Sequence, residues 1–263
     1  MFAAPSSILI TGASSGIGAA LAEHYASAGV TLFLGGRNRE RLDAVADTCR
    51  GYGAEVLTWV GEITDSEGVR EWIVASDVHC PLNLVIANAG VALGSRDVGG
   101  LHQAAVDSFA ANVGGVFNTV HPALERMALR QPYPVKNAQV AIMSSVMGYA
   151  GMARSPAYSS SKAAAKHYGQ ALRGAFRSMG IGVCVICPGY VSTQLTSHNT
   201  SPMPFVMPAQ KAARIIAAGL ARNKARITFP WQMVILARIV INLPNILVDR
   251  LNKPWGAPRL EEH

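Results

Sequence analysis

The sequence predicts an α/β protein built on one doubly wound parallel sheet of about seven strands. Three observations lead to this expectation. Short apolar runs alternate with longer helical patterns along most of the chain. The runs are nearly continuous in apolar residues, as in strands that helices cover on both faces. The chain has 263 residues, half of them hydrophobic and 15% charged, which suffices for one large domain with a buried core.

Strands and helices are expected in alternation. The strands are placed at residues 8–10, 31–34, 55–60, 82–87, 139–143, 182–186 and 226–229. The helices are placed at about 16–28, 38–51, 65–76, 101–130, 156–179 and 208–222. Asn38 is positioned to cap the second helix, and Gly29 and Gly180 to end the first and the fifth. This alternation implies right-handed crossovers, and such sheets bind ligands beyond the carboxyl ends of their strands.

The C-terminal segment differs from the rest in charge. Residues 1–230 are expected to form the single domain, and residues 231–263 an apolar, basic extension packed on it or at an interface. Of the net charge of +7, residues 202–263 contribute +6, from nine Lys and Arg against three Asp and Glu. Residues 231–244 are apolar nearly all round, and Trp231 with the basic residues is typical of a helix at a membrane interface. A subunit interface and a lid over the binding site are the alternatives.

Several protein classes are not expected. The first residues, MFAAPSSILITG, lack the basic and long apolar regions of a secretory signal, which favours a cytoplasmic protein, with contact at the inner face of a membrane as one alternative. Residues 227–237 are shorter than the roughly 20 apolar residues of a spanning helix. No nucleic-acid partner is expected, because no recognition motif accompanies the basic residues. Cys184 and Cys187 should point to opposite faces of a strand, and no metal site is expected.

The first strand leads into a glycine-rich turn, Thr11-Gly12-Ala13-Ser14-Ser15-Gly16-Ile17-Gly18. Gly12 permits the tight turn, Gly16 lets the backbone approach a pyrophosphate, and Gly18 lets the helix pack on the strand. The amides and dipole of the helix N-terminus favour phosphate groups. The turn therefore predicts a Rossmann-type dinucleotide site. Its expected members are Gly12, Ser14, Ser15, Gly16, Ile17 and Gly18.

Five further motifs follow the glycine turn in order along the chain. They are Asn88-Ala89-Gly90, Asn112, Ser144-Ser145, Tyr158-Ser159-Ser160-Ser161-Lys162 and Pro188-Gly189-Tyr190-Val191-Ser192-Thr193. With the turn they resemble the short-chain dehydrogenase/reductase family over residues 7–193, and the elements at 208–229 extend the resemblance. It implies an enzyme that transfers a hydride between a nicotinamide cofactor and a carbonyl or secondary alcohol. It also implies a homodimer or homotetramer that associates through the helices near 101–130 and 156–179.

The Tyr-x-x-x-Lys motif suggests acid–base chemistry. Tyr158 and Lys162 are four residues apart, so they project from one face of a helix. The ammonium is expected to lower the pKa of the phenol from about 10, which makes Tyr158 the proton donor or acceptor. By resemblance, Lys162 also binds the nicotinamide ribose and Asn112 anchors a water on the proton path. Ser145 is favoured over Ser144 as the residue that holds the substrate oxygen.

The end of the second strand bears on the cofactor. No acid occurs between Thr31 and Arg39 that could accept from a ribose 2′-hydroxyl, whereas Arg37 suits a 2′-phosphate. NADP(H) is therefore favoured over NAD(H). Glu62-Ile63 stands where the family usually has Asp-Val beside the adenine. By resemblance the nucleotide site also includes Asn88, Ala89, Gly90, Tyr158, Lys162, Pro188, Gly189, Val191 and Thr193.

The substrate side is apolar and rich in methionine. Met147, Met152 and Tyr190 are the expected substrate contacts, and such adaptable side chains suit a bulky lipophilic carbonyl or alcohol. Ordinary core packing is the alternative for these residues. For the whole protein, the alternative is an idle NADP(H)-binding sensor or scaffold. The complete set of Asn112, Ser145, Tyr158 and Lys162 argues against that alternative.

Overall fold

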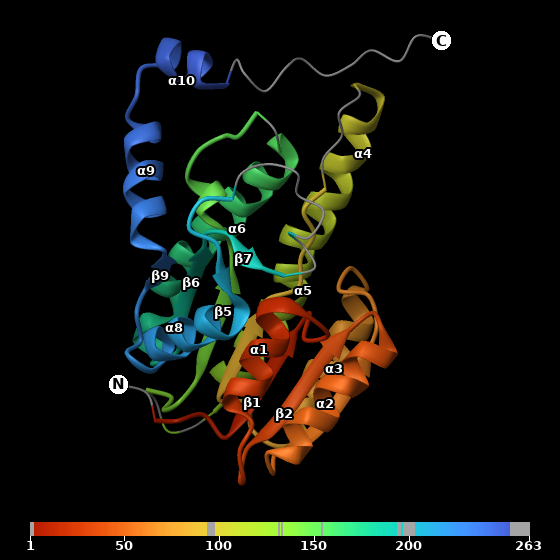
Figure 1. Cartoon of the computed structure of the whole chain (residues 1–263). Coiled ribbons are helices and arrows are strands. Elements are labelled where there is room, and N and C mark those ends of the chain that lie inside the picture. Colours follow the sequence, from red (N-terminus) through yellow and green to blue (C-terminus); the bar gives the residue numbers. More distant parts are fainter. Residues whose placement is uncertain are drawn as a thin grey trace.

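Seven parallel strands form the central sheet in a computed structural model that describes residues 3–93, 98–130, 132, 134–153, 155–193, 196 and 203–252 (Figure 1). Their order is β3-β2-β1-β4-β5-β6-β9. The bounds are Ser7–Thr11 (β1), Thr31–Gly36 (β2), Glu55–Val60 (β3), Leu84–Ala87 (β4), Gln139–Met143 (β5), Gly182–Pro188 (β6) and Arg226–Phe229 (β9). The predicted doubly wound sheet in a single domain is confirmed. A short parallel pair, Val191–Ser192 (β7) and Met207–Pro208 (β8), was not expected.

Helices cover both faces of the sheet, which explains the continuous apolar character of the strands. One core lies under Gly16–Tyr25 (α1), Arg39–Gly51 (α2) and Ala209–Ala221 (α8). The other lies under Ser66–His79 (α3), Gly115–Ala128 (α5) and Pro156–Phe176 (α6). The remaining helices are Val98–Phe109 (α4), Trp231–Ile241 (α9) and Asn245–Asn252 (α10).

The ends of the helices follow the sequence signals in part. Asn38 caps α2, because its side chain accepts a hydrogen bond of 2.8 Å from the Arg41 amide. Gly180 adopts φ of 80° and ends the short helix Arg177–Met179 (η3) after α6. The expectation for Gly29 is wrong. Helix α1 stops at Tyr25 rather than near residue 28, because Ala26 is already extended and Gly29 lies in the following turn.

The single helix expected at residues 101–130 is interrupted. A stretch of π-helix, Ala110–Gly114 (η1), separates α4 from α5. Such stretches are rare and occur mostly at functional sites. Asn112, one of the predicted catalytic residues, lies within this interruption.

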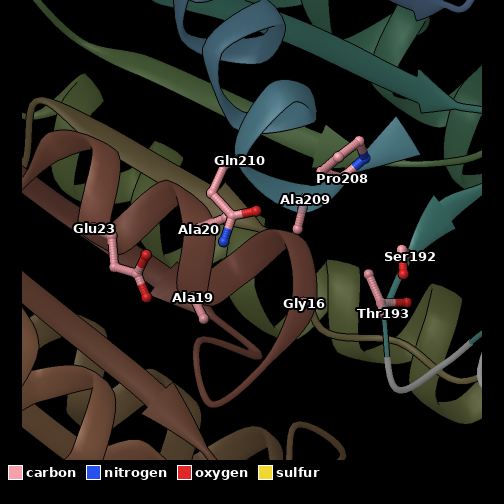
Figure 2. A pocket seen from close by; sticks show the side chains of 9 residues that line it. All are labelled: Gly16, Ala19, Ala20, Glu23, Ser192, Thr193, Pro208, Ala209 and Gln210. Atoms are coloured by element: carbon pink, nitrogen blue, oxygen red, sulfur yellow. The ribbon is translucent and has the colours of Figure 1, made fainter.

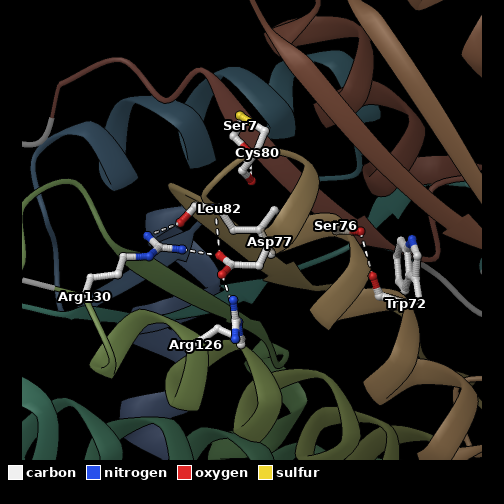
Figure 3. A network of polar contacts seen from close by, with 8 residues as sticks. All are labelled: Ser7, Trp72, Ser76, Asp77, Cys80, Leu82, Arg126 and Arg130. Carbon is white, nitrogen blue, oxygen red and sulfur yellow. Dashed lines mark hydrogen bonds and ion pairs between the residues drawn. The ribbon is translucent and has the colours of Figure 1, made fainter.

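A buried ion-pair network joins α3 to α5 (Figure 3). The Asp77 side chain, 6% exposed, pairs with Nε of Arg126 at 3.0 Å and with Arg130. It also accepts from the Leu82 amide at 3.0 Å, and Arg130 donates to the Leu82 carbonyl at 2.7 Å. The network therefore fixes the two helices and the chain entering β4.

The winding of the sheet reverses between β1 and β4, where ligands of this fold class bind. The C-terminal helices lie to one side of the sheet. Helix α9 follows β9, packs on it and on the turn Val146–Tyr149 (η2), and rises along the edge of the molecule toward α10 (Figure 1). Residues 253–263 lie outside the described residues. Within the described part of the chain, no helix is both long and apolar enough to span a bilayer.

Candidate active site

A cavity of about 1120 Å³ opens at the carboxyl ends of the strands. All of the predicted site residues line it except Gly18 and Asn112. From the nucleotide set these are Gly12, Ser14, Ser15, Gly16, Ile17, Arg37, Glu62, Ile63, Asn88, Ala89, Gly90, Pro188, Gly189, Val191 and Thr193. From the catalytic and substrate sets they are Ser145, Tyr158, Lys162, Met147, Met152 and Tyr190. The fold thus brings together residues that lie up to 181 positions apart, from Gly12 to Thr193.

Each of the three positions in the glycine turn favours glycine, through a positive φ or a close contact. Gly12 has φ of 65°, and a Cβ there would lie 2.9 Å from Cα of Ala89 in the loop after β4. Gly16 has φ of 59°, and its Cβ would lie 3.0 Å from Cγ2 of Thr193. Gly18 is buried beneath the turn, where a Cβ would lie 2.3 Å from the Gly12 carbonyl oxygen. The turn therefore presents a bare backbone to the cavity, as a dinucleotide pyrophosphate requires.

The loop after β4 braces this turn. The side-chain amide of Asn88 donates to the carbonyls of Thr11 at 2.9 Å and Gly12 at 3.1 Å. The Thr11 hydroxyl accepts from the amides of Asn88 and Ala89, both at 3.0 Å. These bonds join the two loops at the point where the winding reverses. Asn88 therefore shapes the cavity partly by fixing the conformation of the glycine turn.

A smaller cavity of about 300 Å³ lies on another side of the same turn, between α1 and α8 (Figure 2). Gly16 and Thr193 line both cavities. Gly16 and Thr193, which contact each other, therefore lie between the two cavities.

Three groups able to hold or move a proton meet at the inner end of the larger cavity. Tyr158 and Lys162 lie on the first turns of α6, and Ser145 follows β5. Ser145 hydrogen-bonds the Tyr158 hydroxyl and accepts from the Met147 amide at 3.1 Å. Nζ of Lys162 donates to the Met143 carbonyl at 3.1 Å and lies 5.8 Å from the centre of the Tyr158 ring. These side chains are held by neighbours rather than by solvent.

The pKa of Tyr158 departs from its ordinary value in the direction opposite to the expectation. Burial raises this pKa, and the hydrogen bond with Ser145 lowers it by less. Burial also lowers the pKa of Lys162 to about 8. The ammonium points to the Met143 carbonyl rather than to the phenol oxygen, so the expected lowering of the Tyr158 pKa by Lys162 is not found. Tyr158 is consequently a protonated phenol at neutral pH.

Asn112 lies behind the cavity wall. Its side-chain oxygen accepts from the Val91 amide at 2.8 Å, and its amide donates to the Val91 carbonyl at 2.9 Å and the Ser161 hydroxyl at 3.0 Å. A Cβ on Gly90 would lie 2.6 Å from the Asn112 oxygen. Asn112 therefore holds the loop after β4 against α6, and its part in a proton path stays a prediction.

The neighbouring serine and the two cysteines have packing roles. Ser144 donates to the Lys162 carbonyl at 2.7 Å, which supports the choice of Ser145 for the reacting oxygen. Cys184 and Cys187 are both free and buried. Cys184 belongs to the core under α1 and α8, whereas Cys187 faces Lys166 and Tyr149. The prediction that their thiols do not meet is confirmed.

Some residues that line the cavity were not predicted from the sequence. Arg41 lines the cavity near Arg37, one helical turn into α2. Nη1 of Arg37 lies 3.8 Å from a Glu62 carboxylate oxygen, so these predicted residues also pair with each other. Met233 and Leu236 bring α9 into the wall. The N-cap at Asn38 was the available signal for Arg41, because it fixes where α2 begins.

These residues fit a dinucleotide. The turn presents backbone where any Cβ would collide, and Ser15, the N-cap of α1, makes no capping bond with its own side chain. Arginines stand at the far end of the same cavity. Fold and site together define a nucleotide-binding oxidoreductase with a serine, tyrosine and lysine set.

Comparison with known proteins identifies the family. The model for the short chain dehydrogenase family matches residues 6–203. The chain is 36% identical over 243 residues to an uncharacterized oxidoreductase of Myxococcus xanthus, covering 92% of this chain and 94% of that protein. It is 30% identical over 248 residues to one of Mycobacterium tuberculosis, covering 92% and 96%. The chain belongs to the short-chain dehydrogenase/reductase family and is an oxidoreductase of the kind that acts on CH–OH or C=O groups.

Solved structures share the fold at low sequence identity. A short-chain dehydrogenase from Sphingobium yanoikuyae in complex with NADPH matches with a TM-score of 0.76 and 24% identity, over 90% of this chain and 96% of that one. One from Burkholderia phymatum in complex with NAD has a TM-score of 0.79 and 22% identity, over 89% and 92%. A bulky-bulky ketone specific alcohol dehydrogenase from Comamonas testosteroni has a TM-score of 0.75 and 23% identity, over 92% and 96%.

Proposed function

We propose that this protein is an NADP(H)-dependent oxidoreductase of bulky, lipophilic carbonyls or secondary alcohols. One observation carries the proposal. The cavity has Ser145, Tyr158 and Lys162 at one end and the arginines 37 and 41 at the other, with the bare glycine turn between them. A single nicotinamide dinucleotide reaches both ends of such a site. The family supports a nicotinamide cofactor.

Two arginines support NADP(H) over NAD(H). Arg37 and Arg41 both line the cavity, and guanidinium groups match phosphate geometry. Many relatives that prefer NADP have a second basic residue in the glycine turn, where this chain has Ser15. Arg41 would take the place of that second cation. Glu62 partly offsets Arg37, because the two side chains form an exposed ion pair.

The chain's own residues supply the proton. When bound, the cofactor supplies the hydride. The phenol of Tyr158 donates its proton from Oη to the carbonyl oxygen, and the Ser145 hydroxyl holds that oxygen in line. The buried ammonium of Lys162 lines the same end of the cavity, where it would hold the ribose of the nicotinamide nucleotide, as the family resemblance implies. Because Tyr158 is protonated at neutral pH, this arrangement supports the carbonyl-reducing direction.

The substrate end favours large apolar groups. Met147, Met152, Tyr190, Met233 and Leu236 line it, and methionine adapts to irregular shapes. The carbonyl must lie near Tyr158, so its substituents extend along these side chains. This placement supports a bulky lipophilic substrate over a small polar one.

Turnover by the purified chain tests the proposal. NADPH oxidation is followed with ketones of increasing bulk, for the native chain and for Tyr158→Phe. We expect turnover to rise with apolar bulk, and Tyr158→Phe to lower kcat by about 100-fold or more because the proton donor is lost. Tight NADPH binding without turnover of any carbonyl would instead favour the sensor or scaffold.

We also propose a homodimer or homotetramer that associates through α4, α5 and α6. Apolar residues on two of these helices are exposed: Val106 at 47%, Phe109 at 42% and Phe117 at 38%. The Phe117 ring packs edge-on against Tyr168 of α6, with ring centres 4.7 Å apart. The mass in solution of the native chain and of Phe109→Asp tests this assembly. A native monomer would contradict it.

A further inference from the structure

Helix α5 supports one wall of the large cavity from behind. The side-chain amide of Asn118 donates to the Ile63 carbonyl at 3.0 Å. A Cβ on Gly115 would lie 2.8 Å from Cγ1 and 2.9 Å from Cγ2 of Ile63, so the helix backbone packs closely on this side chain. Gly115 and Asn118 are three residues apart and therefore lie on one face of α5. That face holds both the backbone and the side chain of Ile63.

Glu62 and Ile63 line the cavity in the segment that connects β3 to α3. Glu62 pairs with Arg37, which places this segment at the arginine end of the cavity. Within the segment, the Asp65 amide donates to the Glu62 carbonyl at 3.1 Å, which is a local turn. Asn118 reaches the segment from 55 positions further along the chain and does not itself line the cavity. Any effect of Asn118 on a ligand must therefore pass through Ile63.

We propose that Asn118 is a positioning residue for nucleotide binding, which fixes residues 62–63 in the conformation that receives the adenosine half of the cofactor. A segment already held in its bound conformation loses less freedom when the ligand binds, so its affinity is higher. The inference rests on the proposed function for the nucleotide that occupies the cavity. It does not depend on the preference for NADPH over NADH, because both carry an adenosine group.

Removal of the Asn118 donor tests the inference. Asn118→Leu keeps the side-chain size, and calorimetric titration should show NADPH and NADH binding weakened by about three- to tenfold, the usual contribution of one hydrogen bond. Adenosine 2′,5′-bisphosphate, which lacks the nicotinamide half, should lose as much. Gln139→Leu is the matched control, because Gln139 also donates a side-chain amide to a backbone carbonyl, that of Leu220 at 3.2 Å. Gln139 begins β5 at the end away from the cavity, so its loss should lower stability without weakening nucleotide binding.

A second pair of variants tests the contact with the helix backbone. Gly115→Ala would press a methyl group against Ile63, whose branched side chain has little freedom to move. It should weaken the binding of both nucleotides without removing any hydrogen-bonding group. Gly114→Ala is the control, because a Cβ there would lie 3.9 Å from the Phe109 carbonyl oxygen, an ordinary contact distance. This control should bind both nucleotides as the native chain does.

Kinetics separate positioning from the chemical step. With saturating nucleotide, kcat of Asn118→Leu should equal the native value, whereas KM for NADPH should rise by the same factor as the dissociation constant. Native nucleotide affinity in both Asn118→Leu and Gly115→Ala overturns the inference, as does an equal loss in Gln139→Leu. A native chain that binds neither nucleotide would overturn the proposed function as well. Nucleotide binding without turnover of any ketone would count against the proposed function alone, since the affinities still test Asn118.

Discussion

The ammonium of Lys166 lies 4.1 Å from the centre of the Tyr149 ring. Lys166 is one turn beyond Lys162 on α6, and Tyr149 ends the short turn η2 that begins beside Ser145. The Tyr149 hydroxyl is 3.1 Å from the Thr228 hydroxyl on β9. Tyr149 therefore connects the segment that carries Ser145 to α6 and β9.

Loss of this connection should reduce the rate more than it reduces binding. In Tyr149→Leu, Ser145 loses its indirect support, and we expect kcat to fall about tenfold, since small displacements of a positioning group are costly. KM for NADPH should change little, because Tyr149 does not line the cavity. Tyr149→Phe keeps the ring beside Lys166 and should retain most of the rate. Steady-state kinetics of both variants check this expectation, and an unchanged kcat in Tyr149→Leu would contradict it.

Lys162 should make the enzyme less stable at neutral pH. Burial lowers its pKa to about 8 in the folded chain, against about 10.4 when unfolded. Below pH 8 both states hold the proton, and burying the charge costs about 3 kcal/mol. As the pH rises from 8 toward 10.4, the unfolded state binds more protons than the folded one, so the cost is relieved.

We therefore expect Lys162→Met to be more stable than the native chain at pH 7 and inactive, with the difference in stability shrinking toward pH 10. Urea unfolding without nucleotide at both pH values measures it. Lys211→Met, at an exposed position on α8, serves as the control and should show no such trend. A difference that grows with pH would refute the assignment.

Arg41 should contribute to NADPH affinity. A hydrogen bond to a charged group is worth about 1.5–3 kcal/mol, so Arg41→Gln should weaken NADPH binding by about tenfold or more. NADH binding should not change, because NADH lacks the 2′-phosphate. Arg39→Gln is the control, because Arg39 is also exposed, lies two residues away and does not line the cavity. Fluorescence titration of both variants with both nucleotides decides the matter, and an equal loss for NADH would argue against this role.

The buried network at Asp77 should dominate the surface ion pairs in stability. Asp77→Ala leaves Arg126 and Arg130 without their carboxylate and should lower the free energy of unfolding by about 3–5 kcal/mol. Glu125→Gln removes the exposed pair with Arg70, at 2.8 Å, and should cost less than about 1 kcal/mol. Denaturant midpoints of the two variants test the contrast. Similar shifts would mean that burial does not set the strength of these pairs.

Sequence patterns predicted the sheet and the nucleotide turn because both depend on local rules. Apolar runs set the strands, and glycine is favoured by positive φ at residues 12 and 16 and by close contacts at residues 12 and 18. The direction of the Tyr158 pKa was predicted wrongly, because burial outweighs the neighbouring charge and burial depends on the whole fold. The sequence also did not predict that Met233 and Leu236 line the cavity. It depends on how α9 packs against η2, a contact between segments far apart in the chain.

The helix α9 has a consequence for how the enzyme changes over evolutionary time. The nucleotide turn and the proposed proton-transfer groups all precede residue 194, whereas the cavity residues of α9, Met233 and Leu236, come later in the chain. Under the proposed function, mutations at these two positions would reshape the substrate end while the redox machinery stays intact. Selection can explore new substrates through this one helix without first passing through inactive intermediates.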